Sequence, residues 1–123
     1  MKKKQVFKTV ATHLLAQNSK SVETGNDDMC VYKHDSGKSC AVGVLIDEKY
    51  YDDLMEGCAA DSVAVIGAVG KSLGSKVTRK DADLLCKLQN IHDYASVDVW
   101  YEELEYLAML TFAKTLEDLG VEA

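Results

Sequence analysis

Apolar side chains recur at helical spacing in three parts of the chain. They return every three or four residues over residues 3–18, again over 78–95, and again over 96–119. Polar side chains fill the positions between them, which is the pattern of an amphipathic helix. The apolar stripes of the three predicted helices comprise Val6, Phe7, Val10, Ala11, Leu14, Leu15, Leu84, Leu85, Leu88, Ile91, Ala95, Trp100, Leu104, Leu107, Ala108, Phe112, Leu116 and Leu119.

Local signals place the ends of the last two helices. Thr78 is followed three residues later by Asp81, which is close to a capping box, where each residue bonds the backbone N–H of the other. Ser96 is suited to begin the last helix, and Gly120 is suited to end it. The last helix is therefore predicted to run for more than five turns.

A glycine turn and an apolar run follow the first predicted helix. Two short segments flank residues 35–37, and because Gly37 accepts a positive φ, this predicts a β-hairpin with Tyr32 opposite Cys40. The next stretch, residues 40–46, reads CAVGVLI and is apolar throughout, so we expect it to be buried. Its pattern leaves open whether it forms a core strand or a short helix.

Two shorter helices are expected between the apolar run and the second long helix. One covers about residues 48–55. The other is capped by Asp61 or Ser62, and its three glycines predict a short or irregular form because glycine weakens a helix. The inward-facing side chains of the first short helix are expected to be Tyr51, Leu54 and Met55.

Together these elements predict one α+β domain over residues 1–123, mostly α, with one short β-hairpin. A hydrophobic fraction of 47% and a length of 123 residues suffice for a buried core, and the absence of proline argues against a rigid linker. No apolar run approaches the length of a membrane span. The basic start lacks the apolar stretch and cleavage site of a signal peptide, so we expect a cytoplasmic protein without a membrane partner.

The net charge of −6 is unevenly distributed along the chain. Residues 1–20 hold five lysines and no acid, residues 21–66 hold ten acids and three lysines, and residues 98–123 hold seven acids and one lysine. Repulsion from phosphate disfavours direct nucleic-acid binding. The acidic stretches serve solubility or attract a basic protein surface. Mimicry of a nucleic acid is a further alternative, weakened by the small net charge and the basic first helix.

Two blocks of the chain carry recognisable motifs. The first joins a tyrosine and a glycine turn to Cys-Ala-Val-Gly-x-Leu-Ile, Asp-Glu-x-Tyr and Met-Glu-Gly; the second joins Leu-Gln-x-Ile-His-Asp to a tryptophan. The residues concerned are Tyr32, Gly37, Cys40, Ala41, Val42, Gly43, Leu45, Ile46, Asp47, Glu48, Tyr50, Met55, Glu56, Gly57, Leu88, Gln89, Ile91, His92, Asp93 and Trp100.

This pattern resembles a family of short, mostly uncharacterised proteins of tailed phages and prophages. The family often has a proline before its Asp-Glu pair, and this chain has none. The resemblance implies a phage origin and a role in the cytoplasm of the infected host cell, and it implies no reaction. Small acidic accessory proteins of phages often bind and disable a host or anti-phage-defence protein, and by analogy the same role is expected here.

Cysteine and histidine side chains are the candidates for chemistry. Cys30, His34 and Cys40 lie within eleven residues, with Cys58 and His92 as possible further ligands, but their spacing matches no common zinc motif. Cys40 is also a candidate nucleophile with His34 or His92 as its base, although burial would raise the pKa of its thiol. We therefore predict no cofactor and no catalytic residue. A small thiol- or metal-dependent enzyme centred on Cys40, His34 and His92 is the alternative.

Tyrosines set among acids are the candidate binding surface. Tyrosine offers a large and rigid contact area, and neighbouring carboxylates attract a basic partner. The competing interpretation makes one tyrosine of each pair a core residue and the other its half-exposed cover. The last helix is also a candidate for pairing with its copy in a homodimer. The predicted interaction surface consists of Asp47, Glu48, Tyr50, Asp52, Asp53, Glu56, Tyr101, Glu102 and Glu103.

Overall fold

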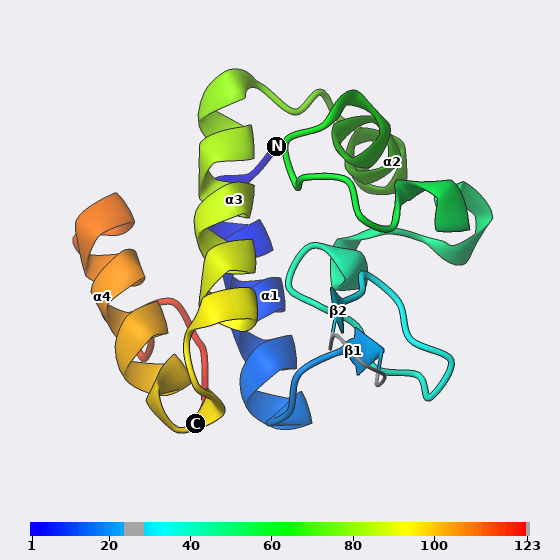
Figure 1. Cartoon of the computed structure of the whole chain (residues 1–123). Coiled ribbons are helices and arrows are strands. Elements are labelled where there is room, and N and C mark those ends of the chain that lie inside the picture. Colours follow the sequence, from blue (N-terminus) through cyan, green and yellow to red (C-terminus); the bar gives the residue numbers. More distant parts are fainter. Residues whose placement is uncertain (24–28, 123) are drawn as a thin grey trace.

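The computed structural model describes residues 1–23 and 29–122 (Figure 1). In the described ranges it is mostly helical, with one two-stranded antiparallel pair, as the sequence predicts for a small α+β domain. None of the helices there is both long and apolar enough to cross a bilayer. The elements, with η for a 3-10 turn, are α1 (Lys3–Gln17), β1 (Val22–Glu23), β2 (Met29–Cys30), η1 (Gly43–Leu45), η2 (Glu48–Tyr50), η3 (Asp53–Met55), α2 (Val63–Leu73), α3 (Arg79–Tyr94), η4 (Val97–Val99) and α4 (Trp100–Phe112).

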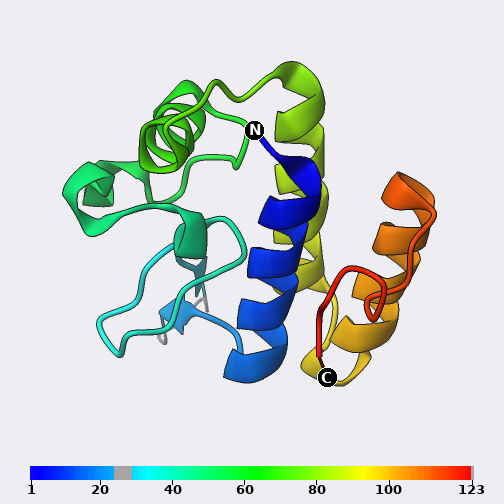
Figure 2. The ribbon, with the colours of Figure 1, turned by 180° about the vertical axis from the view of Figure 1, so that it is seen from behind.

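Helices α1, α3 and α4 pack together through their apolar stripes, and α4 runs antiparallel to the other two (Figures 1 and 2). Phe7 of α1 meets Phe112 of α4 edge to face, with ring centroids 5.6 Å apart, a favourable geometry for an aromatic pair. At the other end of α4, the Trp100 ring lies 5.6 Å from that of His92. The buried apolar residues of these helices are Val6, Phe7, Val10, Ala11, Leu14, Leu84, Leu85, Leu88, Ile91, Trp100, Leu104, Leu107 and Ala108.

Side-chain caps begin both α3 and α2. Thr78 and Asp81 form the capping box at the start of α3, as predicted. Helix α2 is regular and has 11 residues, the fewest of the α-helices in the described ranges, so of the expected short or irregular forms it takes the short one. The Ser62 side chain caps its start, and Gly74 ends it with a φ of +67°, so two strong end signals offset the glycines inside it.

Helix α4 is shorter than the sequence predicts, because it ends at Phe112 and not near Gly120. Ala113 adopts a left-handed conformation with a φ of +55°, which turns the chain back. The Leu116 N–H then donates to Oε1 of Glu105 across 2.9 Å, so a side chain of α4 holds the returning segment. Leu116 therefore reaches the core from a turn, although its position fits the helical stripe.

The predicted turn at residues 35–37 forms, with Tyr32 opposite Cys40 and a bond from the Cys40 N–H to the Tyr32 oxygen at 3.1 Å. It carries only one bridge, between Lys33 and Ser39, while the longer pairing joins β1 to β2. The Tyr32 N–H, which would pair with the Cys40 oxygen in a longer ladder, donates instead to the Glu56 carboxylate at 2.8 Å. The Lys33 N–H, on the outer side of the hairpin, donates to the same carboxylate at 3.2 Å.

The apolar run over residues 40–46 is buried as predicted, apart from the half-buried Val44, and of the two open alternatives, a core strand or a short helix, it contains the short 3-10 helix η1. The expected helix over residues 48–55 is instead two turns, η2 and η3, with an extended link between them. The Asp52 side chain accepts the Leu54 N–H and starts the second turn. As a result Leu54 points outward with 83% of its surface exposed, contrary to the prediction, while Met55 is buried as predicted.

Candidate functional site

The candidate ligands are grouped differently from the sequence prediction. Cys30, His92 and Asp93 come together where α3 ends, and their ligand atoms lie within 4.8 Å of one another. This is the one such group of three or more possible metal ligands in the described part of the chain, and it contains neither His34 nor Cys40. Only Cys30 and His92 of the predicted set are therefore neighbours.

The other predicted ligands make local contacts. Cys40 is fully buried, its sulfur accepts the Gly43 N–H at 3.3 Å, and burial raises the pKa of its thiol to about 12. His34 lies in the hairpin turn, where its Nδ1 is 2.8 Å from the Ser36 hydroxyl. The Cys58 thiol is half-buried and donates to a nearby backbone oxygen. The proposed enzyme centre of Cys40, His34 and His92 is thus not assembled.

Both ring nitrogens of His92 are engaged inside the protein. Nε2 accepts the backbone N–H of Ser21 at 3.0 Å, and Nδ1 lies 2.8 Å from Oδ1 of Asp93. Because Nε2 accepts a hydrogen bond, it carries no proton, so Nδ1 must carry one and donate it to the carboxylate. The side chain of His92 is completely buried. Acting as a base at Nε2 would require the ring to release Ser21.

The same geometry argues against a metal at this cluster. A metal at Nδ1 of His92 needs an unprotonated Nδ1, and the proton would then belong on Nε2, where the Ser21 N–H already points. In the absence of a metal, burial and the Asp93 carboxylate raise the pKa of the Cys30 thiol to about 11. A pocket of about 480 Å³ opens beside Cys30 and Asp93. Because of its raised pKa, the Cys30 thiol in the wall of this pocket is protonated at neutral pH.

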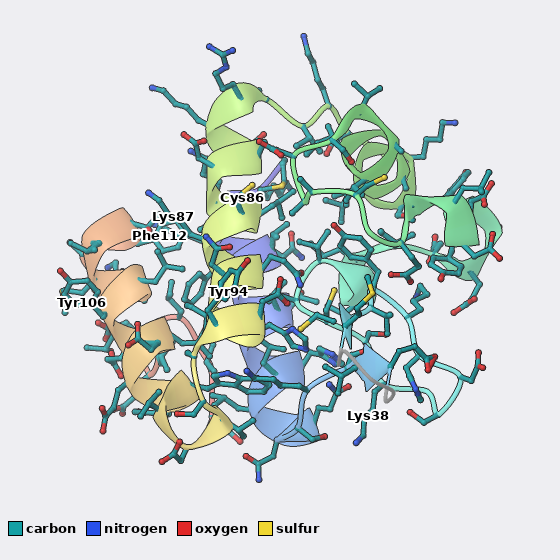
Figure 3. All side chains as sticks on the ribbon, viewed as in Figure 1. Lys38, Cys86, Lys87, Tyr94, Tyr106 and Phe112 are labelled. Carbon is teal, nitrogen blue, oxygen red and sulfur yellow. The ribbon has the colours of Figure 1, made fainter. Side chains whose placement is uncertain are left out.

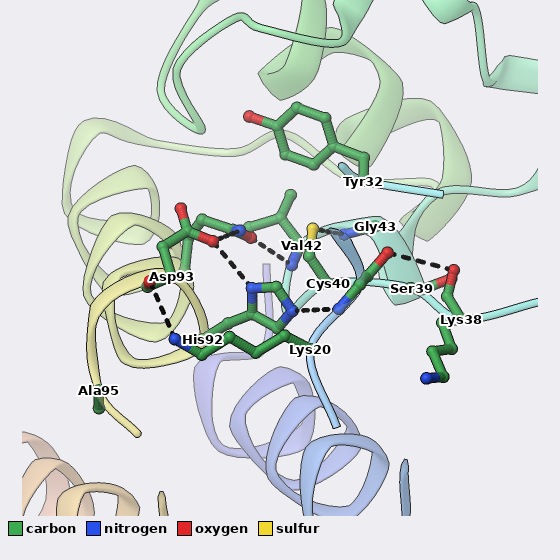
Figure 4. A network of polar contacts seen from close by, with 12 residues as sticks. Lys20, Tyr32, Lys38, Ser39, Cys40, Val42, Gly43, His92, Asp93 and Ala95 are labelled. Atoms are coloured by element: carbon green, nitrogen blue, oxygen red, sulfur yellow. Dashed lines mark hydrogen bonds and ion pairs between the residues drawn. The ribbon is translucent and has the colours of Figure 1, made fainter. Parts of the chain in front are cut away.

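Asp93 links this cluster to the apolar run over residues 40–46. Its Oδ1 accepts from the Gln89 amide at 2.8 Å, and the Gln89 oxygen accepts the Val42 N–H at 3.0 Å (Figure 4). Burial alone would raise the pKa of Asp93, but hydrogen bonds from His92, Gln89 and Cys30 together lower it, so the carboxylate is ionised. The cluster supplies hydrogen-bond partners to buried backbone that lies outside any helix or strand.

The side chains of Gln17 and Glu56 also form hydrogen bonds with loop backbone, a role that the sequence analysis did not predict. Gln17 accepts the Ser39 N–H and donates to the Ser39 oxygen, both at 3.0 Å. Glu56, predicted as part of the interaction surface, turns its carboxylate inward to the backbone of Tyr32 and Lys33. A usable signal existed only in α3, where Gln89 and Asp93 are four residues apart and so share one helix face.

The predicted interaction surface is divided between two sides of the molecule. Asp47, Glu48, Asp52 and Asp53 are exposed around η2 and η3, and Tyr50 is half-buried there. Tyr101, Glu102 and Glu103 are exposed on α4. The two views place α4 and the η2–η3 segment at opposite ends of the molecule (Figures 1 and 2). A single partner of ordinary size therefore contacts one part or the other.

A groove of about 690 Å³ runs between the η2–η3 segment and α2, and we call it the α2 groove. Two of its apolar side chains are unusually open to solvent, because Leu54 is 83% exposed and Val63 is 91% exposed. Such exposure of neighbouring large apolar groups is typical of a binding surface. The groove is lined by Lys49, Tyr50, Tyr51, Asp52, Leu54, Met55, Val63, Ala64, Gly67, Ala68 and Lys71.

Gly67 keeps one wall of the α2 groove bare. A Cβ built on Gly67 would meet no atom within 4 Å, so packing inside the protein does not require glycine at this position. Gly70 differs, since its Cβ would lie 3.1 Å from the Ser75 oxygen. Glycine in a helix interior costs roughly 0.5–1 kcal/mol relative to alanine. Glycine at position 67 therefore makes α2 less stable than alanine would, and it leaves open space in the groove.

The tyrosines of the groove are held in place before any partner arrives. The Tyr51 hydroxyl donates to Oε2 of Glu56 at 2.6 Å, and burial together with the Glu56 carboxylate raises the pKa of Tyr51. The Lys49 ammonium lies 5.1 Å from the centre of the Tyr50 ring, within the range of a cation–π contact. Rigid aromatic side chains lose little entropy on binding.

A scan against protein-family models, a search of curated proteins and a search of solved structures each find no match to this chain. The two candidate sites are therefore compared by their own geometry. At the Cys30–His92–Asp93 cluster, His92 bonds the Ser21 backbone and Asp93, and Asp93 also accepts from Gln89, so these groups are used inside the protein. In the α2 groove, large apolar groups remain open to solvent.

Proposed function

We propose that the protein is a phage-encoded accessory protein that binds a host or anti-phage-defence protein and modulates or inhibits it. We place the binding surface at the α2 groove. The exposure of Leu54 and Val63 beside two tyrosines is the observation that carries the binding part of the proposal. The phage origin and the class of partner are supported only by the resemblance of the two sequence motifs.

Burial of the exposed apolar groups would supply the affinity. Complete burial of a leucine or valine side chain contributes about 1.5–3 kcal/mol. Leu54 and Val63 are nearly fully exposed in the free protein, so most of this gain is available to a partner. The partner would place an apolar side chain in the space left by Gly67, between the η2–η3 segment and α2.

The charge around the groove selects the chemistry of the partner. Asp47, Glu48, Asp52 and Asp53 are all exposed on the η2–η3 side. Two of the lining residues are basic, and one of these, Lys49, already faces the Tyr50 ring. Of these acids only Asp52 lines the groove, so the fitting partner is a protein segment with an apolar anchor in the groove and basic side chains over the acids beside it. Its binding should weaken as salt rises because the acids are open to solvent.

The test fills the groove without disturbing the fold. We would compare capture of host proteins by the wild type and by Gly67→Leu, with Gly67→Ala as the matched control. Leucine at this position enters open space and blocks the groove, whereas alanine leaves most of it free. The proposal expects a partner that binds the wild type and Gly67→Ala with similar affinity and binds Gly67→Leu at least ten times more weakly.

A second comparison separates the two acidic regions. The double reversal Asp52→Lys with Asp53→Lys should abolish capture of the same partner, and Glu102→Lys with Glu103→Lys should leave it unchanged. Binding of the purified partner, measured by calorimetry, would give the affinities. Equal affinity of all these variants would show that the groove is not the binding surface.

A further inference from the structure

Helix α4 presents an apolar face to solvent on the side of the molecule away from the α2 groove. Tyr106, Met109 and Leu110 are 65%, 49% and 66% exposed, although the opposite face of the same helix is buried. Tyr106 projects away from the body of the protein (Figure 3). We call these three residues the α4 face. Apolar groups at spacings of three and four residues form one continuous stripe along a helix.

The two ends of the α4 face carry opposite charge. Glu102 and Glu103 are exposed on the first turn of α4, just before the stripe. At the other end, Leu110 lines a hollow of about 250 Å³ together with Lys3, Lys80 and Lys87 of α1 and α3. One acid, Asp83, also lines this hollow, so its lining side chains sum to a net charge of +2.

We propose that the α4 face binds a second copy of this chain, with the two α4 helices antiparallel about a two-fold axis near Tyr106. Helix α4 has 13 residues and is therefore about 20 Å long. A two-fold axis near its middle brings the acidic end of each helix against the basic end of the other. Glu102 and Glu103 of one copy then face Lys80 and Lys87 of the second copy, and the symmetry makes this contact twice.

The charge pattern favours a second copy over other occupants. A uniformly basic partner would be attracted by Glu102 and Glu103 but repelled by the lysines at the other end. A uniformly acidic partner would be attracted by the lysines but repelled by the two glutamates. A second copy complements both ends at once, with the apolar stripe between them. One helix face is small for a protein interface, so we expect a dimer that dissociates on dilution.

The first experiment measures the oligomeric state by sedimentation equilibrium over a wide range of protein concentration. The wild type should shift from monomer to dimer as its concentration rises. Leu110→Glu should remain a monomer throughout, and Leu54→Glu, which changes an even more exposed leucine in the α2 groove, should behave like the wild type. A wild type that stays monomeric up to millimolar concentration, or equal effects of the two substitutions, would overturn the proposal.

The second experiment uses charge swaps and mixing. The variants Glu102→Lys with Glu103→Lys, and Lys80→Glu with Lys87→Glu, each place like charges across the two-fold axis and should be monomeric. An equimolar mixture should form a heterodimer, because each contact then joins opposite charges. Failure of the mixture to associate would refute this pairing. The result is independent of the α2 groove, since neither variant alters a residue that lines it.

Discussion

Replacement of Gly43 by alanine should be among the most destabilising single-methyl changes in this protein. A Cβ at Gly43 would overlap the Tyr32 carbonyl oxygen and lie 2.7 Å from its carbon. Tyr32 is fixed from several sides, because its oxygen accepts the Cys40 N–H, its N–H donates to Glu56, and its hydroxyl donates to the Cys58 oxygen. The obstacle is therefore backbone that is held in place, and it has little freedom to yield.

The magnitude follows from this lack of freedom. Overpacking of a core usually costs about 1–3 kcal/mol, with the larger values where the surroundings resist movement. We expect Gly43→Ala to lower the free energy of unfolding by about 3 kcal/mol, against a total of roughly 5–15 kcal/mol for a domain of this kind. In a protein of this size the melting temperature should fall by roughly 10 °C.

Urea unfolding monitored by circular dichroism and by fluorescence of the buried Trp100 would measure the change. Gly67→Ala is the matched control, since its Cβ meets nothing within 4 Å, and it should raise the free energy of unfolding by roughly 0.5–1 kcal/mol. A loss below about 1 kcal/mol at Gly43 would show that the Tyr32 segment moves easily, and the reasoning about its anchoring would then be wrong.

Three other predictions concern the buried polar and sulfur groups. Cys40 should resist iodoacetamide at pH 8 until the protein unfolds, because it is fully buried with a pKa of about 12; rapid labelling in the native state would contradict its burial. The pKa of folded Asp93 lies below the ordinary value of about 4, so the ionised carboxylate should stabilise the fold fully above pH ~4 and lose this effect as pH falls further. In urea titrations, the free energy of unfolding of Asp93→Asn should therefore fall less steeply with acid than that of the wild type. Glu56→Gln should lose about 1.5–3 kcal/mol by urea unfolding through weaker bonds to backbone N–H groups, whereas the exposed Glu48→Gln should change stability by less than about 0.5 kcal/mol.

The sequence predicted the helices whose apolar spacing and caps agree with their packing. Helix α3 is the clearest example, since Thr78 and Asp81 set its start and its stripe faces the core. The end of α4 was not predictable in this way. Leu116 continues the helical spacing, but it reaches the core from a turn that the contact with Glu105 fixes, and that contact depends on the tertiary fold.

The same limit applies to the candidate site. The side chains around residues 47–56 were recognised as acidic and aromatic, but their directions depend on backbone turns that no periodic pattern encodes. Asp52 accepts the Leu54 N–H and so turns Leu54 outward, while Glu56 turns inward to anchor Tyr32. Val63 was missed as a surface feature because an apolar residue in the first turn of a predicted helix is normally assigned to the core.

The side chains that hold the Tyr32–Val42 region have a consequence for how the protein opens. The Tyr32, Ser39 and Val42 amides donate to Glu56, Gln17 and Gln89, two of which belong to the helices that form the core. These amides should therefore exchange with deuterium almost as slowly as those inside α1 and α3, despite lying in irregular backbone. The loop and the helices would then unfold as one cooperative unit.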